Sequence, residues 1–182
     1  ILMSQFALGD IPFKTVYLHG LVRDGQGRKF SKSLGNGIDP TEMAQKYGAD
    51  AVRMALVIGN TPGTDTRMSE DKIKAYKHFA NKLWNIARFV LTEIDAVEVV
   101  APLTEADEAI LRHFALLVDD VTRDMDEYRF YLTAEKLYHY AWHELADVIL
   151  EESKPILHGG DERAKNSRKA LLMALLKNTL RL

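Results

Sequence analysis

The spacing of hydrophobic residues changes at a loop of glycine, proline and polar residues, GNTPGTD, at 59–65. Before this loop the apolar residues form short runs, whereas after it they recur every three or four residues along most of the chain. Short β-branched runs bounded by turn residues predict strands, and a 3.6-residue apolar period predicts amphipathic helices. The sequence therefore predicts a mainly α protein, with a small α/β part followed by an antiparallel helical bundle.

The first part is expected to begin with a β-hairpin. The β-branched and aromatic run KTVYLHGLV at 14–22 predicts a strand, RDGQG at 23–27 a tight turn, and 28–30 a short return strand. After the polar loop SKSLGNGIDP, Asp39 and Pro40 have the residue types of a helix start, with Glu42 at the capping-box position. We expect this helix to end at Gly48, and a second one to follow over 49–58.

The second part predicts four helices. Ser69 is the expected N-cap of the first, which runs to Ile94, and a second runs from Pro102 and Thr104 to about 127. A third is expected over about 132–152, and a fourth begins near Asp161. These expectations divide the chain into domains at 1–66 and 67–182.

Composition fits a folded globular chain and excludes several classes. Of the 182 residues, 47% are hydrophobic and 27% are charged, which argues against disorder. The absence of cysteine excludes disulfides and thiolate zinc sites and fits a reducing compartment, so a cytoplasmic location is expected. No apolar run has membrane-spanning length, so no membrane partner is expected. Because the chain begins without methionine and stops inside an apolar helical pattern, we also expect a fragment of a longer protein.

Charge is distributed unevenly along the chain. Residues 95–152 carry 4 Lys and Arg against 15 Asp and Glu, whereas the segments on either side are net basic. A polyanion would therefore contact the two ends rather than the middle, although ordinary solvated helix faces explain the same charges.

The predicted third helix contains residues of the types that bind metal ions. His139, His143 and Asp147 follow at i, i+4 and i+8, and His143-Glu144 begins a string like H-E-x-x-H. The string ends in aspartate and no separate ligand cluster accompanies it, so half-buried histidines on a helix face are favoured and no protein-bound metal is expected. No P-loop, G-x-G-x-x-G or G-x-S-x-G motif occurs either.

The segment GRKFSKSLGN at 27–36 carries the clearest chemical signal. Arg28, Lys29 and Lys32 place three cations within five residues, two serines flank Lys32, and glycines lie near both ends. Ammonium groups, hydroxyls and exposed backbone N–H groups suit a polyphosphate whose charge grows during a reaction. A basic surface hairpin fits the same residues, and physical reasoning alone leaves these two alternatives open.

The string KFSKS at 29–33 resembles the K-M-S-K-S signature of class I aminoacyl-tRNA synthetases, with Phe30 in place of methionine. The longer strings PFKTVYLHGLVRDGQGRKFSKSLGNGIDP, YGADAVRMAL and YHYAWHELADVILEESK resemble the valyl-tRNA synthetase family. The run from TPGTD to FANKLWN favours valine over the isoleucine and leucine families. The substitution at Phe30 is apolar for apolar, so it is expected to change only the packing beneath the loop.

This resemblance implies that 1–66 is the C-terminal end of a Rossmann-type catalytic domain with its stem-contact region, and that 67–182 is an anticodon-binding bundle of the class Ia type. It implies a ligase that converts valine and ATP to valyl-adenylate and then charges tRNA(Val). Lys32 is the implied catalytic cation at the leaving phosphates, with Lys29 more peripheral. The implied ATP-binding set adds Ser31, Ser33, His19 and Gly20, and magnesium comes on the ATP phosphates.

The resemblance also places tRNA on the helical part. The candidate contacts are polar residues of the expected helix that starts after Ser69, together with one arginine before it: Asn81, Lys82, Asn85, Arg88 and Arg67. Leu83, Trp84, Tyr138 and Trp142 are expected to pack in the bundle, because aromatic residues on a helical stripe are usually core.

One family segment does not occur in the chain. There is no H-I-G-H-type string, and His19-Gly20 does not supply one. The valine pocket is expected to lie outside the chain, so we expect the parent protein, a monomer, to be the enzyme and the isolated chain to be inactive. The alternatives are an isoleucyl- or leucyl-tRNA synthetase fragment and a free-standing tRNA-binding module without catalysis.

Overall fold

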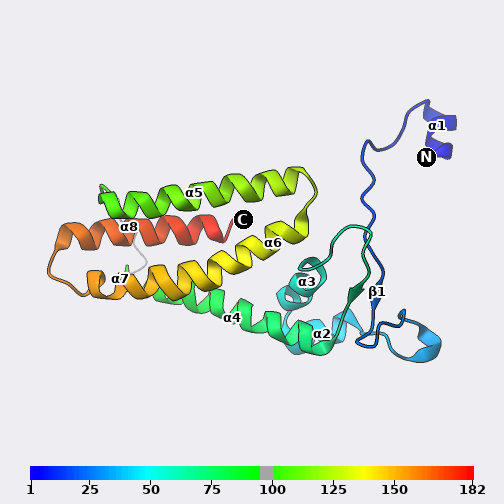
Figure 1. Ribbon diagram of the computed structural model, residues 1–182, viewed down its shortest axis with the longest axis horizontal. Coiled ribbons are helices and arrows are strands. Elements are labelled where there is room, and N and C mark those ends of the chain that lie inside the picture. The colour runs from blue at the N-terminus through cyan, green and yellow to red at the C-terminus, as the bar shows by residue number, and fades with distance from the viewer. Residues whose placement is uncertain (95–100) are drawn as a thin grey trace.

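The computed structural model describes residues 1–94 and 101–182, and most of these residues are helical (Figure 1). The prediction of a mainly α chain is confirmed. Two short strands and a 3-10 turn lie in the first part: β1 Val22–Arg23, β2 Thr66–Arg67 and η1 Lys32–Leu34. The helices are α1 Leu2–Leu8, α2 Pro40–Tyr47, α3 Ala49–Val57, α4 Glu70–Glu93, α5 Glu105–Asp126, α6 Phe130–His139, η2 Tyr140–Ile149, α7 Leu150–Leu157 and α8 Glu162–Thr179. None of the described helices is long and apolar enough to cross a membrane.

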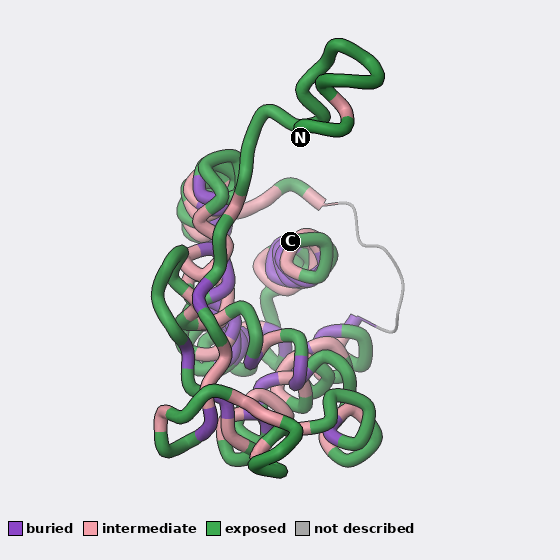
Figure 2. Tube along the Cα trace, turned by 90° about the vertical axis from the view of Figure 1, so that its right-hand side faces the viewer, coloured by how far each residue is buried: buried purple, intermediate pink, exposed green. Residues whose placement is uncertain are grey.

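The second part is an antiparallel bundle whose long helices alternate in direction (Figure 1). Seen end on, α8 lies among the other helices, and buried positions occur around much of its circumference (Figure 2). Leu171, Leu172 and Leu175 are fully buried in α8. The main core of the bundle comprises Ile86, Val90, Ile94, Phe114, Tyr140, Leu145, Ala146, Ile149, Leu150, Leu157, Leu171, Leu172, Met173, Leu175 and Leu176.

The predicted third helix is longer than expected. It starts at Phe130 and continues without interruption through α6, η2 and α7 to Leu157, where the sequence predicted an end near Glu152. Pro155 lies inside α7 and has no backbone N–H to donate to the preceding turn, and the helix ends two residues after it, at Leu157. The middle section, η2, has π-type hydrogen bonding, which widens the helix and shifts the spacing of side chains along its face.

The predicted helix starts are confirmed by their caps. The side chains of Asp39, Ser69, Thr104 and Asp161 each accept a hydrogen bond from a backbone N–H in the first turn of α2, α4, α5 and α8. At Gly48, φ is +94°, a backbone conformation that side chains other than glycine rarely adopt, and α2 ends there.

The predicted strand over 14–22 is wrong for most of its length. Only Val22 and Arg23 pair with a neighbouring strand, and the partner is β2, in parallel, rather than the return strand of a hairpin. The predicted return strand is reduced to one antiparallel bridge between Arg23 and Lys29, which flank the predicted turn. Within this turn, the Gly27 N–H donates to the Asp24 carbonyl. β-Branched residues favour a strand only where another strand pairs with them along its length. In the described ranges, the backbone of residues 14–21 accepts hydrogen bonds from other segments only at Leu18, from the Gly63 N–H, and at Leu21, from the Thr66 N–H.

A second, smaller core lies under the first part of the chain. It comprises Met43, Ala51, Val52, Ala55, Met68 and Ile73, from α2, α3 and the start of α4. Phe30 packs against this cluster, so the apolar residue of KFSKS anchors the loop to the second core. The helix α4 contributes Ile73 to this core and Ile86, Val90 and Ile94 to the bundle core, and thereby joins the two parts.

Three aromatic residues are less buried than the sequence predicted. Trp84 is 73% exposed, because it lies on the outer face of α4. Tyr138 and Trp142 are only half-buried, and they stack with Phe79 on the side of the bundle at ring-centroid distances of 4.7 and 6.3 Å from Phe79. The aromatic ring at the centre of the bundle is instead that of Tyr140, which is 1% exposed.

Candidate functional site

The KFSKS segment forms a closed loop at the end of the molecule opposite the bundle (Figure 1). Lys32 begins the short turn η1, which ends at Gly35 with φ +58°. The Ser31 and Ser33 hydroxyls are 2.8 Å apart, on either side of Lys32. Phe30, Ser31, Lys32, Gly35 and Gly37 line a shallow hollow of about 380 Å³. The structure therefore brings together the serines and the lysine that the sequence singled out.

One buried carboxylate holds the base of this loop. Asp24 is 7% exposed, and its Oδ1 accepts hydrogen bonds from the N–H groups of Gln26 at 3.0 Å and Arg28 at 2.8 Å. Its Oδ2 accepts from Arg28 Nε at 2.8 Å and from Asn36 Nδ2 at 2.9 Å. These bonds, with that from Asn36 first, hold the pKa of the Asp24 carboxyl well below its usual range. The carboxylate is therefore ionised wherever the protein is folded near neutral pH.

The three loop cations have different environments. The Arg28 guanidinium is paired with Asp24. The side chains of Lys29 and Lys32 are exposed, and within 1–94 and 101–182 neither ammonium forms a hydrogen bond or an ion pair. The loop therefore presents two uncompensated positive charges next to two hydroxyls, an arrangement suited to phosphate oxygens.

His19 and Gly20 lie on the segment that enters β1. Gly20 is buried against the 64–65 backbone, and the backbone N–H of Leu21 donates to Asp65 Oδ1 at 2.8 Å. His19 is exposed, and its Nδ1 lies 2.7 Å from the carbonyl oxygen of Gly20. Gly20 thus has a packing role, while the imidazole of His19 stays accessible from solvent.

The candidate tRNA contacts do not form one set. Asn81, Asn85 and Arg88 are exposed on one face of α4, and Trp84 lies on the same face between them. Lys82 lies off this face, where its Nζ pairs with Asp147 Oδ1 at 2.8 Å and lies 5.5 Å from the Trp142 ring centroid. Arg67 belongs to β2, and its guanidinium lies close to Gly27.

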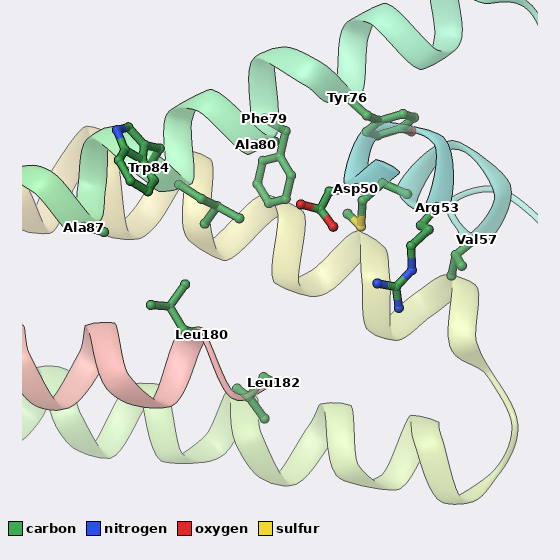
Figure 3. A pocket seen from close by; sticks show the side chains of 12 residues that line it. Asp50, Arg53, Val57, Tyr76, Phe79, Ala80, Trp84, Ala87, Leu180 and Leu182 are labelled. Atoms are coloured by element: carbon green, nitrogen blue, oxygen red, sulfur yellow. The ribbon is translucent and has the colours of Figure 1, made fainter. Parts of the chain in front are cut away.

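The exposed face of α4 borders an apolar groove of about 720 Å³ between α3, α4 and the end of the chain after α8 (Figure 3). Trp84 and Ala87 form one end, and Leu180 and Leu182 project towards the groove from the opposite side (Figure 3). Arg53 of α3 adds a positive charge at the other end.

The histidines of the long helix lie close to carboxylates. His143 Nδ1 is 3.7 Å from Asp147 Oδ2, and His139 Nδ1 is 3.6 Å from Glu144 Oε1. In the described part of the chain, no group of three or more His, Asp or Glu side chains is arranged to hold a metal ion.

Sequence reasoning missed the residues that hold the loop. From the sequence, Asp24 is predicted only to lie in a turn, and Asn36 only to lie in the loop. The signal was present, because aspartate at the start of a turn and asparagine near glycines commonly bond to nearby backbone N–H groups. The contact between the two side chains, which are 12 residues apart, has no local signature.

The chain is similar in sequence to known proteins over almost its whole length. Residues 1–69 match the family described as tRNA synthetases class I (I, L, M and V), and residues 107–182 match the anticodon-binding domain of tRNA ligase. The chain is 44% identical over 179 residues to the valine–tRNA ligase of Bacillus cereus, and 42% identical over 182 residues to that of Clostridium acetobutylicum. These matches take in 96% and 97% of the chain and 20% and 21% of the relatives, so the chain spans about a fifth of their length.

Solved structures share the fold. The LeuRS of Agrobacterium radiobacter K84, in its ternary complex with tRNA and LeuAMS, matches 98% of the chain and 22% of its own with a TM-score of 0.75 at 24% identity. The methionyl-tRNA synthetase of Mycobacterium tuberculosis, in complex with methionyl-adenylate, matches 88% of the chain and 35% of its own with a TM-score of 0.69 at 25% identity.

Proposed function

The chain belongs to the class I tRNA synthetases, and from this premise we propose that it is the phosphate-binding loop and tRNA-binding bundle of a valine–tRNA ligase. The observation that carries the proposal is the KFSKS loop with two lysines that have no ion-pair partner among the described residues, in a chain 44% identical to a valine–tRNA ligase over almost its whole length. The reaction is the activation of valine with ATP to valyl-adenylate and pyrophosphate, followed by transfer of the valyl group to tRNA(Val).

Lys32 acts on the phosphates of ATP. When the carboxylate of the amino acid attacks the α-phosphorus, the bond to the bridging oxygen breaks and negative charge moves onto the departing pyrophosphate. An ammonium group next to that charge stabilises the transition state more than the bound ATP. Lys29 is a second cation for the same phosphates, and the hydroxyls of Ser31 and Ser33 donate hydrogen bonds beside it. Magnesium enters this reaction on the ATP phosphates.

The exposed face of α4 is the proposed contact with tRNA. Arg88 suits a phosphate oxygen, while Asn81 and Asn85 can hydrogen-bond to ribose or base edges. Trp84, which lies exposed between them, offers a ring on which an unpaired base can stack. Lys82 is a weaker candidate than the other residues, because its ammonium is already paired with Asp147.

The two proposed sites can be tested against each other in the full-length protein that carries this chain. We expect Lys32→Ala to slow valyl-adenylate formation by about 2–4 kcal/mol in activation free energy, with valine and tRNA binding unchanged. We expect Arg88→Ala to leave adenylate formation unchanged and to weaken tRNA binding, lowering the slope of log K against log salt by about one. Single-turnover adenylate formation and filter binding of tRNA measure the two effects.

Each variant is the control for the other. Adenylate formation at the wild-type rate in Lys32→Ala would show that the loop does not act on the phosphates of ATP. An unchanged salt slope in Arg88→Ala would show that the exposed face of α4 does not bind tRNA. Replacing valine by isoleucine or leucine in the same assay tests the amino acid, and faster activation of either one would assign the chain to that synthetase instead.

A further inference from the structure

We propose that Asp24 is a positioning residue that fixes the KFSKS loop through Asn36, so that the Lys32 ammonium is held where the phosphates bind. This inference rests on the phosphate role proposed for the loop and adds a residue outside the KFSKS string. It starts from the finding that Asp24 is buried while the loop it supports is largely exposed.

Asp24 closes the loop at its base. The hydrogen bond from Asn36 Nδ2 to Asp24 Oδ2, 2.9 Å long, joins the residue before the loop to the residue that ends it. With this bond in place, the segment 25–35 is tied at both ends, and its backbone loses much of the freedom of an open loop of the same length. Rigid support of this kind is what a preorganised charge requires.

Asn36 transmits this constraint to the backbone that leads into the phosphate-facing lysine, Lys32. Its Oδ1 accepts a hydrogen bond from the Ser31 N–H at 2.9 Å, and its Nδ2 also lies 3.2 Å from the Lys29 carbonyl oxygen. The backbone is therefore fixed at the residue immediately before Lys32 and again two residues earlier. Asp24 needs no contact with phosphate to place the ammonium, because it acts through the Asn36 amide.

The Asp24 carboxylate forms an ion pair with Arg28, one of the three loop cations. Arg28 Nε lies 2.8 Å from Asp24 Oδ2, while Lys29 and Lys32 have no partner within the described ranges, 1–94 and 101–182. The carboxylate thus holds the loop without neutralising the lysines that face solvent. The amide of Asn36 complements an ionised carboxylate, because it donates with Nδ2 and keeps Oδ1 for the Ser31 N–H.

The test is an exchange of the two side chains in the full-length protein. In Asp24→Asn, an amide group replaces one carboxylate oxygen, so an N–H group must face Arg28 or Asn36, both of which donate to Asp24 in the wild type. In Asn36→Asp, two carboxylates meet. We expect each single variant to lower the single-turnover rate of adenylate formation roughly 10- to 100-fold, the scale of a misplaced catalytic group. The KM for valine stays within about twofold, because the change is confined to the phosphate side.

Rescue distinguishes pairing from general damage. The double variant Asp24→Asn with Asn36→Asp restores one amide opposite one carboxylate, and we expect it to recover at least about tenfold of the lost rate. Asp39→Asn is the matched control. It removes the same charge at the N-cap of α2, just after the loop, and asparagine caps a helix as well as aspartate, so the rate stays unchanged.

Combination with Lys32→Ala shows whether Asp24 acts through that lysine. If it does, adding Asp24→Asn to Lys32→Ala lowers the rate less than about twofold further, because the group it positions is already gone. Multiplying effects, or a wild-type rate in Asp24→Asn when Lys32→Ala is slow, would overturn the inference and leave the proposed function standing. A wild-type rate in Lys32→Ala would overturn the proposed function itself.

Asn36→Ala gives a second route if Asp24→Asn does not fold. It removes the amide that reaches Ser31 and Lys29 and leaves the bonds of Asp24 to Gln26 and Arg28 intact. The same selective loss of rate is expected, and a wild-type rate in a folded Asn36→Ala protein would overturn the inference.

Discussion

At Gly20 two segments of backbone pass so close that no side chain fits between them. A Cβ on this residue would lie 1.8 Å from the Thr64 carbonyl oxygen. The contact is secured next to it by Asp65, whose carboxylate accepts from the Leu21 N–H and pairs with Arg23. The strands β1 and β2 are placed beside each other in this way, and with them the turn that leads into the KFSKS loop.

We expect Gly20→Ala to lower the free energy of unfolding by about 1–3 kcal/mol, because the backbone of 64–65 must move to admit the methyl group. Gly25→Ala is the matched control, since a Cβ there meets nothing within 4 Å, and its effect should stay below about 0.5 kcal/mol. Urea unfolding of the full-length protein measures both. Equal effects of the two substitutions would show that the close approach at Gly20 does not constrain the fold.

Helix ends in this chain are fixed by side chains that bond to the next element. The clearest case joins α5 to α6, where the buried Asp124 carboxylate contacts Arg129 at 2.7 Å and Lys136 at 2.8 Å. The backbone turns sharply there, with Tyr128 at φ +59°. The bonds from Lys136 and Arg129, in that order, hold the pKa of Asp124 below its ordinary value of 3.8. The junction is therefore sensitive to acid.

The lowered pKa of Asp124 makes the stability of the folded protein depend on pH. Because the folded state favours the ionised carboxylate, the contribution of Asp124 is fully present above about pH 4 and is lost as the pH falls through the folded-state pKa. We expect Asp124→Asn to be less stable than the wild type at pH 6, and the difference to shrink as the pH is lowered towards 2. Urea titrations across this range measure it. Asp126→Asn, at an exposed neighbour, is the control and should change stability at pH 6 by less than about 0.5 kcal/mol. An equally small change in Asp124→Asn at pH 6 would contradict the prediction.

The bundle is organised around α8, which packs among its other helices and carries a buried ion pair. Arg168, 4% exposed, contacts Asp107 of α5 at 2.7 Å and donates to the Ser153 hydroxyl of α7 at 3.1 Å. The Ser167 hydroxyl donates to the same Asp107 carboxylate and accepts from the Thr104 N–H. Three helices therefore meet at one charge pair, which fixes how α8 lies between them.

We expect Arg168→Met to destabilise the bundle by about 3–5 kcal/mol, because the Asp107 carboxylate is then buried without its cation. Arg163→Met, in the first turn of the same helix and exposed to solvent, should change stability by less than about 0.5 kcal/mol. Adding Asp107→Leu to Arg168→Met should recover part of the loss, because it removes the unpaired charge. If the double variant recovers no stability, the loss caused by Arg168→Met comes from altered packing and not from the unpaired Asp107 charge.

The sequence by itself determined most of the helices and the family resemblance. Apolar stripes and capping residues are local signals, and they located the starts of α2, α4, α5 and α8 correctly. The dense run of cations and serines in KFSKS fits either phosphate binding or a basic surface hairpin. The longer resemblance indicates the tRNA synthetase family, whose models match residues 1–69 and 107–182. The assignment of individual residues to ATP and to tRNA, and the boundary at residue 66, stay predictions.

Only the tertiary structure decided what depends on residues distant in sequence. The run at 14–22 reads as a strand, but pairing needs a partner, and β2 comes more than 40 residues later and reaches only Val22 and Arg23. Trp84 follows the apolar spacing of α4, yet it is exposed and lines the groove between α3, α4 and the residues after α8. Asp24 reads as an ordinary turn residue until the fold buries it and brings Asn36 against it. Burial and long-range pairing depend on where the chain returns, and local propensity carries no information about that return.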